Sequence, residues 1–194
     1  MSDMVTIYGF APSTFVRTVR MVCVEKGISH ELLPLEFKQA THEVLHPFKR
    51  MPIIKVNNTT LFESLACATY LDEAFLGQSL QPVEPVERAI MHQWISACSH
   101  YLYHEAILPL IQDSDVLETR QEDFQEKFLP LDIALQQAPF VAGSALTLAD
   151  LFVTPIVAFL DQAKGGEAFI DQFDALRGWS DRIYATDSFT LTAS

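Results

Sequence analysis

The sequence has few of the residues that mark redox, nucleic-acid-binding or membrane proteins. Its three cysteines, Cys23, Cys67 and Cys98, lie far apart and form no Cys-x-x-Cys pair, so we expect buried thiols in a reducing compartment. Only 13 residues are Lys or Arg against 25 that are Asp or Glu, giving a formal net charge of −12. Because nucleic-acid binding needs a concentrated basic surface, we expect no nucleic-acid partner.

Long apolar runs and a signal-like N-terminus are also missing. No run of about 18 apolar residues could span a bilayer, and no basic segment leads into an apolar one. We therefore expect a cytoplasmic protein with no membrane partner. Residues that can form a hydrophobic core are abundant, since 49% of the residues are hydrophobic and 14 are Phe. With 194 residues, the chain can bury one large core or two small ones.

Residues 1–77 alternate short strand patterns with helical ones. The patterns predict a strand over 5–8, a helix over 15–26, a strand over 30–35, a helix over 38–46, two strands within 51–62 and a helix over 64–75. A β-α-β unit followed by β-β-α is the thioredoxin-like order. We therefore predict an α/β N-terminal domain with a four-stranded sheet, parallel in its first half and antiparallel in its second.

The composition and the hydrophobic periodicity of the chain change after residue 77. Residues 78–87 are mostly polar and contain two prolines, which marks a linker. Helical periodicity then predicts an all-α domain over residues 88–194, with helices over 88–111, 116–137, 147–164 and 173–185. Pro130 lies inside the second of these helices and is expected to kink or split it.

One short motif points to a metal. The segment His42-Glu43-Val44-Leu45-His46 matches H-E-x-x-H, in which two histidines one helical turn apart bind zinc. Such a site needs a long helix and a third ligand, whereas Pro47 ends this segment at once. We therefore expect no metal.

Four motifs occur in order along the chain. They are Ala-Pro-Ser-Thr-Phe-Val-Arg-Thr-Val-Arg at 11–20, Met51-Pro52, Leu-Phe-Glu-Ser at 61–64, and Pro-Phe-Val-Ala-Gly at 139–143 followed by Leu-Thr-Leu-Ala-Asp at 146–150. Together with the α/β-then-α order, they resemble the cytosolic glutathione S-transferases of serine type, with similarity to phi-class and related bacterial members. The resemblance covers nearly the whole chain.

The resemblance implies how glutathione is held. Met51-Pro52 resembles the family's cis-proline step, in which the Met51 backbone would pair with the cysteinyl backbone of glutathione. Ser64 and the N–H groups at the start of its helix would hold the γ-glutamyl carboxylate, while Glu63 would accept hydrogen bonds from the ammonium group. By composition alone, Glu63 and Ser64 are ordinary helix-capping residues.

The resemblance also implies a catalytic role for Ser13. In serine-type members, the matching hydroxyl donates a hydrogen bond to the glutathione sulfur and favours the thiolate. The positive end of the first helix and Arg17 would add to this effect. By composition alone, Ser13 caps the helix that starts near Phe15, and Thr14 is the rival hydroxyl.

The group that binds the glycyl carboxylate is less clearly marked. Arg50, directly before Met51, is the best placed cation, with Lys38 and His42 behind it. Many family members have Asn-Pro-x-Gly in this region, whereas this chain has His46-Pro47-Phe48-Lys49, so that lysine replaces glycine.

The electrophile is expected between Phe10 and the first long helix of the second domain. Trp94, Cys98, Tyr101 and His104 recur on that helix at helical spacing, a pattern that is usually core. Tyr101 and His104 are the preferred pair, because an aromatic face and a polar tip can both line a cleft.

The resemblance leads to one function and leaves alternatives open. It implies a homodimeric glutathione transferase that conjugates the glutathione thiolate to small apolar electrophiles, with glutathione as co-substrate. The alternatives are a non-catalytic ligand-binding or interaction protein with the same fold, and a glutathione-dependent peroxidase, which is weakened because the first loop has no cysteine. Thr147 and Asp150 are assigned to stability as a capping box.

Overall fold

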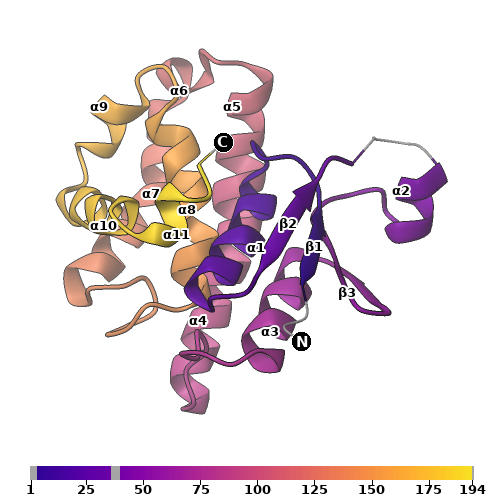
Figure 1. The fold of residues 1–194 in the computed structure, drawn as a ribbon. Helices are drawn as coiled ribbons and strands as arrows, with labels where there is room; N and C mark the ends of the chain where they lie inside the picture. The colour runs from indigo at the N-terminus through magenta and orange to yellow at the C-terminus, as the bar shows by residue number, and fades with distance from the viewer. Residues whose placement is uncertain (1–3, 36–39, 194) are drawn as a thin grey trace. The chain divides into compact units, whose positions relative to one another are not determined.

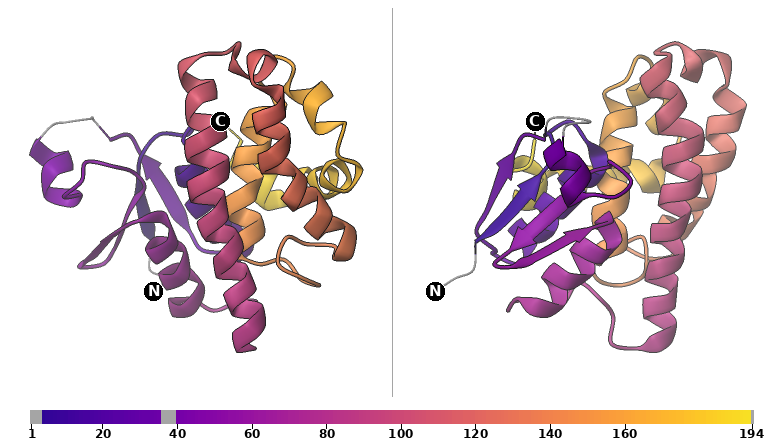
Figure 2. Two further views of the ribbon diagram at one scale, coloured as in Figure 1. Left: turned by 180° about the vertical axis from the view of Figure 1, so that it is seen from behind. Right: turned by 90° about the vertical axis from the view of Figure 1, so that its right-hand side faces the viewer.

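The computed structural model describes residues 4–35 and 40–193, which form two compact units (Figures 1 and 2). The first unit extends to Ser79 and resumes at Thr186, and the helical unit is Leu80–Ala185. The sequence prediction placed a linker at 78–87 and the whole C-terminus in the helical domain. In the structure a helix already begins at Pro85, since proline suits the first turn of a helix, and the last residues join the first unit.

The first unit contains a four-stranded sheet, which confirms the predicted thioredoxin-like arrangement. Within the described residues its elements are β1 (Val5–Tyr8), α1 (Thr14–Glu25), β2 (His30–Leu33), α2 (Ala40–Leu45), β3 (Ile53–Val56), β4 (Thr59–Phe62), α3 (Ser64–Ala74) and α11 (Asp187–Thr190). The strand order is β2-β1-β3-β4. β1 pairs with β2 in parallel and with β3 antiparallel, and β3 pairs with β4 antiparallel.

Helices α1 and α3 cover one face of this sheet (Figure 1). Alternate residues of β1 are buried, and α1 buries an apolar stripe that includes Val16, Val19 and Val22. Gly9 lets the loop after β1 approach α1 closely, because a Cβ there would lie 2.5 Å from Cγ2 of Val16. The start of α1 is therefore held against the end of β1.

A buried ion pair joins the far ends of α1 and α3. Lys26 Nζ lies 3.0 Å from Oδ1 of Asp72, and both side chains are almost fully buried. The same ammonium donates to the carbonyl oxygens of Asp72 and Gln78 at 3.0 and 3.1 Å. Since a buried charge is costly unless fully paired, this network holds the two helices in one arrangement.

The helical unit is all-α in its described residues, as predicted. Its elements are α4 (Pro85–Ala97), η1 (Cys98–Ile107), α5 (Leu108–Gln112), α6 (Val116–Thr119), α7 (Gln121–Gln137), α8 (Leu148–Asp161), α9 (Gly166–Ile170) and α10 (Asp174–Tyr184). α8 is almost entirely buried and packs against α4, η1 and α10. Across both units, the described residues contain no helix with the length and apolar character needed to cross a membrane.

The first long helical segment of this unit changes from α-helix to π-helix and back to α-helix. α4, η1 and α5 follow one another without a break from residue 85 to residue 112 (Figure 2). η1 is a π-helix, in which the N–H of Leu108 bonds to the carbonyl of Tyr103, five residues back. Pro109 offers a reason, because its ring would collide with the carbonyl of Glu105 in an α-helix and it has no N–H to donate.

The sequence predicted that Pro130 would kink or split α7, and the helix is not split. The helix runs through it from Gln121 to Gln137. Pro130 lies on the exposed side of α7, where water can hydrogen-bond the carbonyl that the missing N–H leaves open. The exposed position explains why the helix continues.

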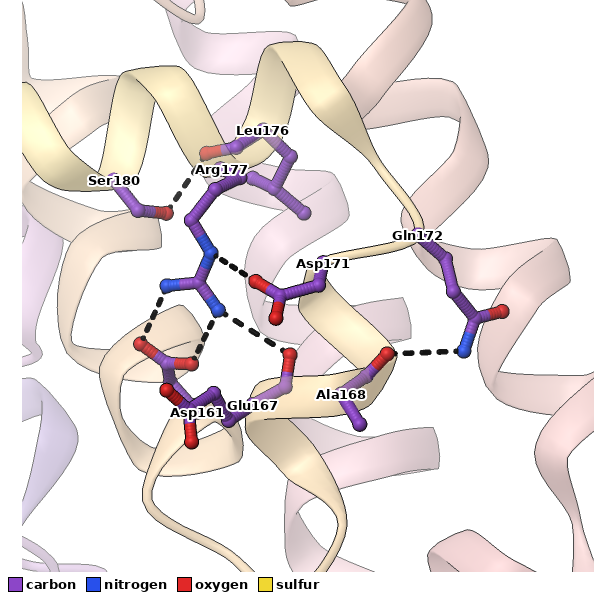
Figure 3. Close-up of polar contacts among 8 residues, drawn as sticks. All are labelled: Asp161, Glu167, Ala168, Asp171, Gln172, Leu176, Arg177 and Ser180. Atoms are coloured by element: carbon purple, nitrogen blue, oxygen red, sulfur yellow. Dashed lines mark hydrogen bonds and ion pairs between the residues drawn. The ribbon is translucent and has the colours of Figure 1, made fainter.

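Arg177 of α10 ties three helices of the unit together (Figure 3). Its guanidinium forms a two-pronged ion pair with Asp161 at the end of α8, with distances of 2.8 and 3.1 Å. It also donates to the carboxylate of Asp171 at 2.8 Å and to the carbonyl of Glu167 at 3.3 Å. Bidentate geometry makes this one of the stronger kinds of surface ion pair.

Candidate functional site

Three segments leave the sheet of the first unit at the same end. Tyr8 is the last residue of β1 and pairs with Ile53, the first residue of β3, which pairs in turn with Phe62, the last residue of β4. The loop after β1, the segment before β3 and the start of α3 therefore begin from one row across the sheet. Ser13, Met51 and Glu63 lie on these three segments. The register of the strands therefore brings the predicted glutathione residues to the same end of the sheet.

The peptide bond between Met51 and Pro52 is cis, as predicted. Pro52 is buried and Met51 is half-buried directly before β3. Neither the N–H nor the C=O of Met51 hydrogen-bonds to another residue that the structure describes. This backbone can therefore accept an extended peptide-like ligand, which would add to the sheet as a further strand.

The N-terminus of α3 is open. Its N-cap residue, Glu63, has no side-chain capping hydrogen bond, and its carboxylate forms no hydrogen bond or ion pair with the residues described here. Glu63 has φ 68° and ψ 119°, a costly conformation for a residue with a side chain. Ser64, half-buried beside it, also lacks a described partner for its hydroxyl. The free N–H groups, hydroxyl and carboxylate form a donor and acceptor set for an amino-acid headgroup.

Ser13 is the N-cap of α1. Its Oγ accepts a hydrogen bond from the N–H of Val16 at 3.5 Å, which is long for such a bond. The side chain is half-buried, whereas the rival Thr14 is only 7% exposed. Of the two hydroxyls, Ser13 is thus the one that a ligand can reach.

Lys49 adopts the backbone conformation that glycine would favour. Its φ is 53°, in the left-handed region, where a side chain makes the conformation costly. The next residue, Arg50, is exposed, and its guanidinium has no partner among the described residues. Arg50 can therefore receive a carboxylate, while the rival cation Lys38 lies outside the residues that the structure describes.

The two histidines of the H-E-x-x-H motif face their own loop. Nε2 of His42 lies 3.1 Å from the carbonyl oxygen of Arg50, and Nδ1 of His46 accepts the N–H of Phe48 at 3.1 Å. The His46 ring lies 4.6 Å from the ring of Phe62, and the residue is 1% exposed. Burial lowers the pKa of His46, which favours the neutral ring. We interpret both histidines as holding the loop that carries Arg50 and Met51.

The residues predicted to contact the electrophile fall in both units. Phe10, in the first unit, is 44% exposed, and Tyr101, in the helical unit, is 55% exposed. His104 is also exposed and lies edge-on to Tyr103. Cys98 differs, because it is fully buried and donates its S–H to the carbonyl of Phe152. The π-helical winding of η1 breaks the α-helical spacing on which that predicted stripe was based.

The N-terminus of α8 is closed by its own residues. Asp150 accepts hydrogen bonds from the N–H groups of Val141 and Thr147 and from Trp179 Nε1, at 2.9 to 3.0 Å, and from the Thr147 hydroxyl at 3.1 Å. The Thr147 hydroxyl also accepts the N–H of Ala149. Burial raises the pKa of Asp150, against the effect of these donors. The predicted capping box is thus present and is wider than expected.

The three cysteines are free and buried, as predicted. Burial raises the pKa of Cys23 and of Cys67 to about 12 and also raises the pKa of Cys98. Because the thiolate is the reactive form, these cysteines are poor nucleophiles at neutral pH.

Part of this arrangement has no strong signal in the sequence. The roles of His42 and His46 could be suspected from their spacing of four residues, which places them on one face of a short helix. The left-handed conformation of Glu63 has no signal, since glycine or asparagine would be expected there.

Both parts of the chain match family models. Residues 12–74 match the model for the glutathione S-transferase N-terminal domain, and residues 109–182 match that for the C-terminal domain. Together the two matches cover well over half of the chain. They correspond to the first unit and to the helical unit.

Named relatives and solved structures agree with these matches. A glutathione S-transferase of Pseudomonas putida is 26% identical over 76% of this chain and 71% of its own length. A maleylacetoacetate isomerase of Mus musculus is 26% identical over 81% of this chain and 79% of its own. The crystal structure of a poplar glutathione transferase has a TM-score of 0.86 at 22% identity, covering 97% of this chain and 95% of its own. The last comparison shows a shared fold.

Proposed function

Because the chain belongs to the glutathione S-transferase family, a family that uses glutathione as co-substrate, we propose that it conjugates the glutathione thiolate to small apolar electrophiles. The observation that carries this proposal is the register of β1, β3 and β4, which brings Ser13, Met51 and Glu63 to one end of the sheet. Each of the three offers a different kind of group, namely a hydroxyl, an unpaired backbone and an open helix terminus.

Ser13 is the proposed catalytic residue. A free thiol with a pKa of about 8.5 is only a few per cent ionised at neutral pH. Lowering that pKa by about two units would ionise most of the thiol, at about 2.7 kcal/mol of differential interaction. A hydrogen bond from the Ser13 hydroxyl, together with the positive end of α1, can supply much of this.

The other glutathione contacts follow from the groups that the fold leaves open. The Met51 backbone pairs with the cysteinyl moiety next to Pro52, and Arg50 binds the glycyl carboxylate. Ser64 and the first N–H groups of α3 bind the γ-glutamyl carboxylate, and Glu63 accepts from the ammonium group. Support comes from the absence of competing partners for these groups among the described residues.

Phe10, Tyr101 and His104 are the proposed electrophile contacts. Their support is exposure, since all three side chains reach the surface of their unit. Tyr101→Ala should raise the KM for an apolar electrophile several-fold and leave the KM for glutathione unchanged. An equal change in both KM values would count against a direct contact.

Family membership also supports three broader proposals. We propose that the protein is a homodimer, that it works in the cytoplasm and that it serves detoxification, as a transferase with apolar electrophiles would. Sedimentation analysis would test the first, and fractionation of expressing cells the second. A monomer with full activity would overturn the dimer as a requirement for function.

The decisive experiment compares wild type with Ser13→Ala in conjugation of glutathione to an aryl halide. Loss of the hydroxyl should lower the rate at pH 7 by up to roughly 20- to 30-fold, the limit that is reached when the whole two-unit shift in the thiol pKa is lost. Thr14→Val, which removes the buried rival hydroxyl, is the matched control and should leave the rate within about twofold. Equal rates for wild type and Ser13→Ala would overturn the catalytic role of Ser13.

The same experiment separates the alternatives. Glutathione affinity without conjugation would indicate a binding protein. A glutathione-dependent peroxidase is disfavoured because position 13 is serine and all three cysteines are buried.

An isomerase that uses glutathione is the second candidate, because a mouse relative named maleylacetoacetate isomerase is 26% identical over 81% of this chain. Isomerisation leaves the glutathione concentration unchanged, whereas conjugation consumes one molecule per product.

A further inference from the structure

The C-terminal strap, residues 186–193, is an ordered part of the first unit and packs on α1 (Figure 1). It contains α11, which is capped where the hydroxyl of Thr186 accepts the N–H of Phe189 at 3.3 Å. The hydroxyl of Thr192 donates to the carbonyl of Ser188 at 2.6 Å, and both residues are almost fully buried. The strap therefore has a defined conformation and presents defined groups to α1.

Arg17 connects this strap to Ser13. Its guanidinium donates to the carbonyl of Phe189 at 3.0 Å and to the hydroxyl of Thr192 at 3.4 Å, and its Cζ lies 4.1 Å from the centre of the Phe189 ring. Its backbone N–H donates to the carbonyl of Ser13 at 2.9 Å. Arg17 is only 9% exposed. One residue is thus bonded to the strap through its side chain and to the candidate catalytic residue through its backbone.

Arg20 adds a second connection between α1 and the strap. Its guanidinium donates to the carbonyl oxygens of Thr192 at 3.0 Å and Leu191 at 3.4 Å. Two cations from successive turns of α1 therefore bind carbonyl groups at the end of α11, where a helix favours positive charge. The guanidinium of Arg17 thus contacts the strap, and its expected effect on the thiolate stays a prediction.

We infer that the C-terminal strap is a positioning element for the Ser13 hydroxyl and acts through Arg17. This inference rests on the proposed role of Ser13. The hydrogen bond from Val16 to Ser13 Oγ is long, at 3.5 Å, so the cap alone holds the hydroxyl weakly. Fixing Arg17 to the strap holds the first turn of α1, and with it the Ser13 backbone. A fixed Ser13 backbone limits the positions that its hydroxyl can take relative to the glutathione sulfur.

The test uses the full chain with Arg17→Lys and Phe189→Leu. Arg17→Lys keeps the charge but loses the planar fork and much of its stacking on Phe189. Phe189→Leu keeps the arginine and the carbonyl but removes the ring. Arg182→Lys is the matched control, because Arg182 also donates to carbonyl groups, those of Gly178 and Pro139, but lies in the helical unit. The readout is the pH profile of conjugation, which reports the pKa of the bound glutathione thiol.

Arg17→Lys should raise that apparent pKa by about 0.5 to 1 unit and lower kcat at pH 7 about 1.5- to threefold, with KM for glutathione changed less than twofold. Phe189→Leu should shift the pKa in the same direction by less. In a Ser13→Ala background, Arg17→Lys should add no further shift, because the group it positions is gone. Arg182→Lys should leave the profile unchanged.

Two failures are distinguishable. If Ser13→Ala alone leaves conjugation unchanged, the proposed role of Ser13 is wrong and the inference falls with it. If Ser13→Ala has its expected effect but Arg17→Lys does not shift the pKa, or shifts it equally without Ser13, only the inference is overturned.

Discussion

The N-termini of α3 and α8 differ in whether other residues of the chain satisfy their N–H groups. Each helix begins with N–H groups that have no partner inside the helix. At α8, Thr147 and Asp150 satisfy such groups, and Asp150 also takes hydrogen bonds from Val141 and Trp179. At α3, the N-cap Glu63 satisfies none with its side chain and holds a costly backbone conformation. One terminus is closed by its own residues, and the other is open at the place where we propose that glutathione binds.

The difference separates residues kept for stability from residues kept for binding. Where a helix terminus closes on buried internal groups, removing one group leaves several others unsatisfied, and the cost appears in folding. Where the terminus is open, removing a group changes little in the free protein, and the cost appears in affinity for the ligand. The predictions below test this division, from the largest expected effect to the smallest.

Asp150→Ala should break the closed terminus. It leaves the N–H groups of Val141 and Thr147 and the indole N–H of Trp179 buried without an acceptor, so the free energy of unfolding should fall by about 3–5 kcal/mol. Urea denaturation measures this. Asp174→Ala, which removes an exposed carboxylate from the first turn of α10, is the control and should cost about 0.5 kcal/mol or less. Similar costs for both variants would contradict the assignment.

Glu63→Gly tests the open terminus of α3, because it should keep or raise the free energy of unfolding while it lowers the affinity for glutathione. Glycine tolerates the positive φ, so the unfolding free energy should stay level or rise by up to about 1 kcal/mol. Affinity for glutathione, measured by calorimetry, should fall about tenfold or more as the carboxylate is lost. Glu63→Gln, which keeps the backbone cost, should weaken binding without the gain in stability. Unchanged affinity in both variants would remove Glu63 from the site.

The two hydroxyl caps should differ in their cost to stability. Thr147→Ala loses two hydrogen bonds of 3.1 and 3.2 Å and should cost about 1–2 kcal/mol. Ser13→Ala loses one bond of 3.5 Å and should cost about 0.5 kcal/mol or less, although it is expected to damage activity far more. Thermal or urea unfolding of the two variants decides. A larger loss of stability for Ser13→Ala would indicate that Ser13 is chiefly a structural cap.

The first unit should also lose stability in mild acid through His46. Burial lowers the pKa of His46, so the folded state prefers the neutral ring. Below the unfolded pKa of about 6.5, the unfolded chain binds a proton that the folded chain does not, and stability must fall as the pH falls. His46→Gln should flatten this dependence in urea unfolding measured across that range. His100→Gln, at an exposed histidine of η1, is the control and should not.

Local patterns in the sequence predicted those features that depend on interactions between residues close together in the chain. The strands, the main helices and the capping box at Thr147 depend on neighbouring residues. The cis step at Met51-Pro52 was predicted from the family resemblance, since few X-Pro bonds are cis. Other features depend on contacts that no local pattern records. The strap meets Arg17 across 175 positions of sequence at Thr192. The π-helix could be predicted only if the helix were known to continue through Pro109. α7 continues through Pro130 because that residue lies on its exposed side.

The strap sets a condition on the order in which this protein can fold. Both ends of the chain belong to the first unit, and the helical unit is the segment between them. During synthesis α1 is made first, and the partners of Arg17 and Arg20 follow more than 170 positions later. The first unit therefore reaches its final form only after residues 186–193 have been made. A chain without residues 186–193 would lack the contacts that we infer position Ser13.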